Sequence, residues 1–227
     1  MLTEIISTLD SLDTQLFTWL NSFHSPFFDT LMWTLSAKET WIPLYICITV
    51  LLFVKNWKQA LIILLTMAIC ITLADQISST VIKEVVARPR PSHNDVLTGT
   101  IHILNNYRGS PFGFVSSHAA NTFAFITLLA MIIRNHYFMI VGTVWASAVT
   151  YSRIYLGVHY PGDIIGGIAV GVLSAMAAYA LYKMTISNLE RRKIVDNSPF
   201  GKIYANISTL IIGANLLTTI VISIFML

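Results

Sequence analysis

Long apolar runs, separated by short polar connections, dominate this sequence and limit what it can fold into. A helix that crosses a membrane needs roughly 20 mostly apolar residues, with a range of about 17 to 25. The first of these apolar runs, residues 40–54, is shorter than this range, and it is expected to be extended by one helical turn from residues 36–39. The pattern predicts an all-α integral membrane helical bundle of about six transmembrane helices, formed by residues 40–54, 59–82, 119–133, 138–158, 164–184 and 203–227.

The composition agrees with a chain whose main solvent is lipid. Hydrophobic residues make up 55% of the 227 residues and charged residues only 11%. Soluble domains carry about a quarter charged residues, so this chain cannot cover a water-exposed surface. A net charge of +3 on so apolar a chain indicates membrane topology rather than binding of nucleic acid. Cys47 and Cys70 lie inside apolar runs and define no disulfide framework.

Residues 1–37 follow a different pattern, because their apolar residues recur at three- and four-residue steps opposite Glu4, Asp10 and Asp13. Such a helix is expected to lie along the membrane interface rather than cross it. Pro26 then breaks the chain before a second short interfacial piece. We therefore divide the chain into N-terminal interfacial helices, a transmembrane core, and a basic cytoplasmic loop with a final transmembrane helix: 1–37, 38–185 and 186–227.

Three polar segments fall at helix ends that share one side of the membrane if successive helices alternate: 83–91, 114–118 and 152–163. Cations at membrane depth cost a few kcal/mol each, so charge there indicates a function. Lys83, Arg90 and Arg153 would repel one another unless an anion joined them, and arginine matches tetrahedral oxyanions. Ser116 and Ser117 begin a helix, where hydroxyls and unpaired amides bind anions. These segments predict a phosphate site.

Two histidines could supply chemistry at that phosphate. His159 and Asp163 are four residues apart at the start of a helix, so they lie on one face, one turn apart. The carboxylate would fix the imidazole tautomer and leave the other ring nitrogen free to attack. His118, on another helix, could act as general acid on the leaving-group side. Because three cations can neutralise the developing charge, no metal and no other cofactor is expected.

The three segments resemble the three motifs of the type 2 phosphatidic acid phosphatase (PAP2) superfamily. The motif Lys-six residues-Arg-Pro is matched by Lys83, Arg90 and Pro91. The motif Pro-Ser-Gly-His corresponds to residues 115–118, with Val115 and Ser117 in place of proline and glycine. The motif Ser-Arg-five residues-His-three residues-Asp is matched by Ser152, Arg153, His159 and Asp163. The motifs lie in this order within about a third of the chain, inside the expected core 38–185.

This resemblance implies a phosphohistidine intermediate on His159, oriented by Asp163. His118 would protonate the leaving oxygen and then activate the water that hydrolyses the intermediate. The resemblance also implies that the phosphate is held by the remaining motif residues, namely Lys83, Arg90, Arg153, Ser116 and the amide of Ser117.

Three further charged residues invite interpretation. Arg108, in the loop 92–113, could reach a second phosphate if the substrate is a diphosphate. Arg88, beside the first motif, is expected to anchor lipid headgroups. Asp75 lies inside the second apolar run, where a carboxylate needs a partner that the sequence does not identify.

The distribution of Lys and Arg sets the expected orientation. The Lys and Arg residues that have no evident function lie in short connectors on the side away from the histidines. An excess of Lys and Arg is typical of the cytoplasmic side, so that side is expected to be cytoplasmic. These residues are Lys55, Lys58, Arg134, Lys183, Arg191, Arg192, Lys193 and Lys202. The expected protein is a multi-pass protein of the bacterial plasma (inner) membrane, with its site facing the periplasm or outside.

The function that these observations favour is a metal-independent phosphatase acting on a lipid phosphate or diphosphate. Candidate substrates are undecaprenyl diphosphate, phosphatidylglycerol phosphate, phosphatidic acid and a lipid A phosphate. A lipid phosphotransferase would use the same intermediate, and a non-catalytic phospholipid transporter would use the same basic pocket. A transporter has no need of His159 and Asp163. The expected partner is a membrane lipid, with no nucleic acid.

Overall fold

The computed structural model describes residues 1–226, apart from the side chains of Leu2 and Thr3. Leu227, the last residue of the expected sixth span, lies outside the described residues. The described chain is helical and contains no named strand. Its helices are α1 (Leu2–Asn21), α2 (Pro26–Ser36), α3 (Ile42–Lys55), α4 (Trp57–Gln76), α5 (Lys83–Val86), α6 (Ser117–Ile133), α7 (His136–Tyr155), α8 (Pro161–Arg191) and α9 (Lys202–Phe225).

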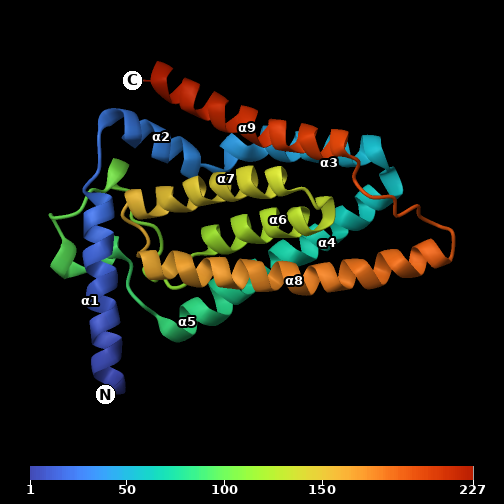
Figure 1. Cartoon of the computed structure of the whole chain (residues 1–227). Coiled ribbons are helices and arrows are strands. Elements are labelled where there is room, and N and C mark those ends of the chain that lie inside the picture. Colours follow the sequence, from blue (N-terminus) through green and yellow to red (C-terminus); the bar gives the residue numbers. More distant parts are fainter. Residues whose placement is uncertain (227) are drawn as a thin grey trace.

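The six expected apolar runs coincide with α3, α4, α6, α7, α8 and α9, which pack side by side (Figure 1). Helix α6 contacts α4, α7 and α8, so it lies at the centre of the bundle. Helix α1 crosses one end of the bundle, beside the end of α7 and the start of α8 (Figure 1). That end also carries the loop 87–116, so the three polar segments meet there.

Two of the short links between helices end in an asparagine that caps the next helix. The side chain of Asn56 accepts from the amides of Lys58 and Gln59 at the start of α4. Asn135 accepts from the amide of Phe138 at the start of α7. Because a helix leaves its first amides unpaired, these caps let the chain reverse direction within a few residues.

Within residues 1–226, three helices are long and apolar enough to cross a membrane: Trp57–Val86, which combines α4, α5 and the π-helical residues between them, α8 and α9. The pair Pro26–Ser36 and Lys38–Lys55, bent by 68°, brings the number to four if it acts as one span. The prediction of an all-helical membrane protein is therefore confirmed.

Helices α6 and α8 approach each other closely, because glycines of α8 face the backbone of α6. A Cβ on Gly171 would clash with the carbonyl oxygen of Ala120 and would lie 2.9 Å from the amide nitrogen of Ala124. A Cβ on Gly167 would meet the carbonyl oxygen of Ser116 and lie 2.8 Å from Cβ of Ala119. This contact holds the start of α6 against the start of α8, where residues of two motifs lie.

Replacing Gly171 by alanine should therefore push the two helices apart. We expect Gly171→Ala to lower the free energy of unfolding by about 1–3 kcal/mol, the usual cost of overpacking. Gly213, on α9, has open space around the position of a Cβ, so Gly213→Ala should leave stability unchanged or slightly raised. Thermal unfolding of both variants in detergent micelles tests this, and equal midpoints would contradict the close α6–α8 contact.

Candidate active site

The histidine and the aspartate of the third motif form a buried pair. Arginine can only donate hydrogen bonds, so Nη1 of Arg90, 2.7 Å from Nε2 of His159, donates to that nitrogen. The proton of the neutral ring then lies on Nδ1, which donates to Oδ2 of Asp163 over 3.2 Å. The imidazole thus presents its unprotonated nitrogen to the guanidinium of Arg90.

The chain around this pair holds the carboxylate in place. The backbone amide of Tyr160 donates to Oδ2 of Asp163 over 3.0 Å, so Asp163 caps the first turn of α8. Gly113, in the loop before α6, lies against the same oxygen, since a Cβ there would be 2.8 Å from it. The loop before α6 therefore closes over the pair.

Arg90 is almost wholly buried and is held by backbone carbonyls on both sides of the pair. Its Nε donates to the carbonyl oxygen of Ser110 over 2.6 Å, and Nη1 donates to that of Val158 over 2.8 Å. Burial and the nearby charge of Arg153 lower the pKa of Arg90 to about 10. The group therefore stays charged at neutral pH.

Arg153 is also buried, and it donates to the hydroxyl oxygens of Ser36 and Tyr107. Its Nε is buried and has no acceptor among the described residues. Lys83 donates to Oγ of Ser117 over 3.3 Å. Lys83 follows a π-helical segment, Ile77–Ile82, at the end of α4, and such segments are frequent at functional sites.

The three motif cations form no ion pair with a carboxylate in the described part of the chain: Lys83, Arg90 and Arg153. Burial and the charges of Arg90, Arg153 and Lys83 hold the pKa of His159 well below its usual value. The ring is therefore neutral at physiological pH, and the lone pair of its Nε2 accepts the hydrogen bond from Arg90. Phosphate oxygens would supply the anionic acceptors that these cations lack.

The second motif begins α6 and ties it to α8. Oγ of Ser116 accepts from the amide of Ala119 over 3.4 Å, so this serine is the N-cap of α6. The amide of Ser116 donates to the carbonyl oxygen of Asp163 over 2.9 Å. Ser117, the first residue of the helix, contacts Lys83, and His118 follows it. The structure thus brings residues of all three motifs to one end of the bundle.

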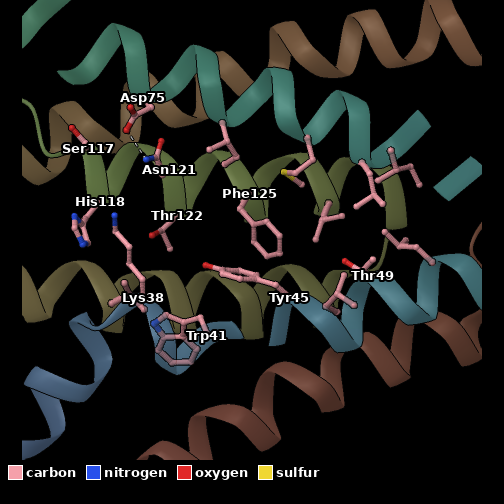
Figure 2. A pocket seen from close by; sticks show the side chains of 18 of the residues that line it. Lys38, Trp41, Tyr45, Thr49, Asp75, Ser117, His118, Asn121, Thr122 and Phe125 are labelled. Carbon is pink, nitrogen blue, oxygen red and sulfur yellow. Dashed lines mark hydrogen bonds between the residues drawn. The ribbon is translucent and has the colours of Figure 1, made fainter. Parts of the chain in front are cut away.

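A cavity of about 600 Å³ extends from this region between α3, α4 and α6 (Figure 2). Ser117, His118 and Lys38 line one end, and the Lys38 ammonium nitrogen lies between His118 and Thr122. The other walls are mostly apolar: Trp41, Tyr45, Ile48, Leu52, Ile63, Leu64, Met67, Ile71, Phe125, Leu129 and Val149. A cavity that is polar at one end and apolar along its length suits an amphiphilic ligand.

Sequence reasoning missed several polar residues here. Asp75, which needed a partner, accepts a hydrogen bond from Nδ2 of Asn121 over 2.9 Å, and both line the cavity. Asn121 lies four residues after Ser117 on the same helix face, a spacing that could have identified it. Lys38 and Tyr107 come from segments outside the three motifs, so motif spacing alone does not identify them as residues of the site.

Arg108 lies outside this group of residues. Its side chain is exposed, and Nη1 donates to the carbonyl oxygen of Ser92 over 2.6 Å. Oγ of Ser92 in turn donates to the carbonyl oxygen of Arg108 over 2.7 Å. Arg108 therefore closes the loop 92–113 on itself.

The expected role of Arg88 as a lipid-headgroup anchor is wrong. Its guanidinium forms ion pairs with Asp10 at 2.6 Å, Asp13 at 2.7 Å and Asp163 at 3.2 Å. Its charge is therefore engaged by carboxylates of the protein. The prediction failed because two of these carboxylates come from α1, which is distant in the sequence.

The fold and this geometry define an enzyme of phosphate esters embedded in a membrane. A family model described as the PAP2 superfamily matches residues 59–187, more than half of the chain, and the chain belongs to this superfamily. It is similar to proteins named lipid A 4′-phosphatase in two bacteria. That of Bacteroides thetaiotaomicron is 37% identical over 185 residues, which cover 80% of this chain and 82% of the relative.

The relative in Porphyromonas gingivalis is 36% identical over 170 residues, which cover 74% of this chain and 71% of the relative. Among solved structures, a transmembrane PAP2-type phosphatidylglycerolphosphate phosphatase of Bacillus subtilis is similar in fold. Its TM-score is 0.58, with 23% identity, over 80% of this chain and 88% of that chain. This chain is therefore a membrane-bound hydrolase of phosphoric monoesters.

The buried neutral His159 makes folding sensitive to acid. Its pKa is lower in the folded protein than the value of about 6.5 in an unfolded chain, so unfolding takes up a proton. Stability therefore falls as the pH drops below about 6.5. Between about pH 7.5 and about pH 5, we expect the unfolding temperature of His159→Gln to fall by less than that of the wild type.

Thermal unfolding at the two pH values measures this difference. His93→Gln is the matched control, because the side chain of His93 is exposed, and it should lose as much as the wild type. An equal loss in all three proteins would show that His159 is not the proton acceptor.

Proposed function

We propose that this chain is a lipid phosphatase that removes the 4′-phosphate of lipid A or of a closely related glycolipid. The observation that carries the phosphatase chemistry is the contact of 2.7 Å between Nε2 of His159 and the guanidinium of Arg90. Because of this contact, a phosphate bound to Arg90 would lie directly against the proposed nucleophilic nitrogen. The choice of lipid A rests on the names and similarity of the two bacterial relatives.

In the proposed reaction, Nε2 of His159 attacks phosphorus while the bond to the leaving oxygen breaks. The proton on Nδ1 stays hydrogen-bonded to Asp163, which stabilises the positive charge that the ring acquires. His118 gives its proton to the leaving oxygen, so the lipid departs as a neutral alcohol. Water then attacks the phosphohistidine, with His118 taking up a proton, and releases inorganic phosphate.

The proposed phosphate ligands are the three motif cations and the start of α6. Lys83, Arg90 and Arg153 would each face a non-bridging oxygen and neutralise the charge that grows in the transition state. Ser116 and the amide of Ser117 would add hydrogen-bond donors at the helix N-terminus. No step needs a metal ion, and the described residues include no cluster of three or more His, Cys, Asp or Glu side chains suited to one.

The cavity suggests how the lipid lies. The alcohol that leaves would sit beside His118, at the polar end, and alkyl chains would extend along the apolar walls between α3, α4 and α6. Burial of acyl chains in the apolar part of this cavity would hold the headgroup at the site.

We also propose that all six long helices cross the plasma (inner) membrane and that the site faces the periplasm. Helix α1 would lie in the interface, since it crosses the end of the bundle and its apolar side is exposed: Ile5, Ile6, Leu9, Leu12, Leu16 and Trp19. In this arrangement, 1–37 is interfacial, 38–185 is the catalytic core, and 186–227 is a cytoplasmic loop followed by the last span.

Release of phosphate from purified lipids tests the function. We expect the wild type to hydrolyse a lipid A 4′-phosphate in the presence of EDTA, and His159→Ala to lose activity by a factor of about 10³ or more, as for other catalytic nucleophiles. Activity on undecaprenyl diphosphate, phosphatidic acid and phosphatidylglycerol phosphate should be lower. Activity that requires a divalent cation, or that survives in His159→Ala, would contradict the mechanism.

Lys38 should contribute to binding of the anionic headgroup, because its ammonium group lines the polar end of the cavity beside His118. We expect Lys38→Met to raise KM about tenfold, equivalent to roughly 1.4 kcal/mol of lost binding, with little change in kcat. Lys202→Met is the control, since Lys202 is exposed at the start of α9. Unchanged KM in Lys38→Met would remove Lys38 from the site.

A further inference from the structure

Helix α1 faces the bundle with a stripe of three polar residues and one phenylalanine, while most of its apolar residues are exposed. The stripe consists of Asp10, Asp13, Phe17 and Asn21, which are spaced three or four residues apart and so share one face. Phe17 and Asn21 are buried, and the side chain of Asp13 is only 15% exposed. Asp13 therefore lies against the protein, whereas the side chains of Asp10 and Glu4 are 62% and 85% exposed.

Asp13 reaches the first turn of α8, which carries Asp163. Its Oδ1 accepts from the amide of Gly162 over 2.7 Å, and its Oδ2 accepts from Nη1 of Arg88 over 2.7 Å. A Cβ on Gly162 would lie 2.7 Å from Oδ2 of Asp13, so only glycine permits this approach. Asp10 accepts from Nη2 of Arg88 over 2.6 Å.

The guanidinium of Arg88 also contacts the carboxylate of Asp163. Nη1 of Arg88 also donates to Oδ1 of Asp163 over 3.2 Å, and Oδ2 of Asp163 faces His159. The Arg88 guanidinium lies 4.0 Å from the centre of the Tyr160 ring, which supports it from one side. One oxygen of Asp163 is thus held by Arg88 and the other by the histidine that it orients.

A second polar contact fixes α1 at its C-terminal end. Nδ2 of Asn21 donates to the carbonyl oxygen of Tyr155 over 2.8 Å and to that of Ile154 over 3.2 Å, at the end of α7. Oδ1 of Asn21 accepts from the amide of His102 over 2.7 Å. With both Asp13 and Asn21 bound, α1 cannot shift along the end of the bundle without breaking buried hydrogen bonds.

We propose that Asp13 and Arg88 are positioning residues for catalysis, through which α1 sets the orientation of Asp163 and hence of His159. The proposal rests on the proposed phosphohistidine reaction. Asp13 holds the guanidinium, the guanidinium holds Oδ1 of Asp163, and Oδ2 remains turned toward Nδ1 of the imidazole. Without Arg88, three carboxylates with no cation between them would repel, and Asp163 would turn away from the ring.

Kinetics of the isosteric variants separate this role from simple support of the fold. We expect Asp13→Asn and Arg88→Gln each to lower kcat about tenfold with KM nearly unchanged, as for loss of an interaction made in the transition state. Arg88→Lys should recover part of the loss, because it restores the charge. Glu4→Gln, on an exposed residue of α1, is the control and should match the wild type.

The double variant tests whether the two residues act in series. Because Asp13 is proposed to act through Arg88, adding Asp13→Asn to Arg88→Gln should lower kcat little further. Multiplied effects on kcat, an effect on KM alone, or a loss that only follows a lower unfolding temperature would overturn the proposal.

A measurement without substrate distinguishes failure of this proposal from failure of the proposed function. Nitrogen NMR of labelled histidine in micelles reports which ring nitrogen of His159 carries the proton, with His159→Gln identifying the signal. We expect the Nδ1-protonated ring in the wild type and a mixture of the two tautomers in Arg88→Gln. An unchanged ring in that variant would overturn the positioning role, whatever lipid the protein hydrolyses.

Discussion

Buried positive charge without a matching carboxylate is the constraint on which this structure depends. Arg90 and Arg153 are buried, and Arg90 directly contacts the neutral ring of His159. Isolated buried cations are expensive, and backbone carbonyls and hydroxyls only partly offset that cost. In the proposed reaction, a bound oxyanion would complete the site and would be held against the proposed nucleophile.

Close packing of α6 against α8 holds these residues in place. The dyad lies at the start of α8, the cap and first turn of α6 lie beside it, and Gly167 and Gly171 allow the two helices to touch. Because the carbonyl of Asp163 accepts from the amide of Ser116, the two motifs are joined through the backbone as well. The relative position of the two motifs thus comes from close helix packing, in which small residues let backbones approach.

Much of this could be predicted from the sequence. The six apolar runs gave helices in the expected places, because hydrophobic length and short capped turns are local properties. The pairing of His159 with Asp163 followed from their four-residue spacing at a helix start, and the structure places them 3.2 Å apart. The links made by Arg88 could not be predicted, because its partners Asp10 and Asp13 come from α1, which is distant in the sequence.

The sequence by itself determined a helical membrane protein with three polar motifs at helix ends and the chemistry that those residue types allow. Only the tertiary structure decided which side chains surround them: that α1 presents its acids to Arg88, and that Lys38 enters the cavity beside His118. Hydrophobic periodicity and motif spacing depend on residues that are close together in the sequence. Contacts between distant segments depend instead on how helices cross and approach, which single-chain patterns do not encode.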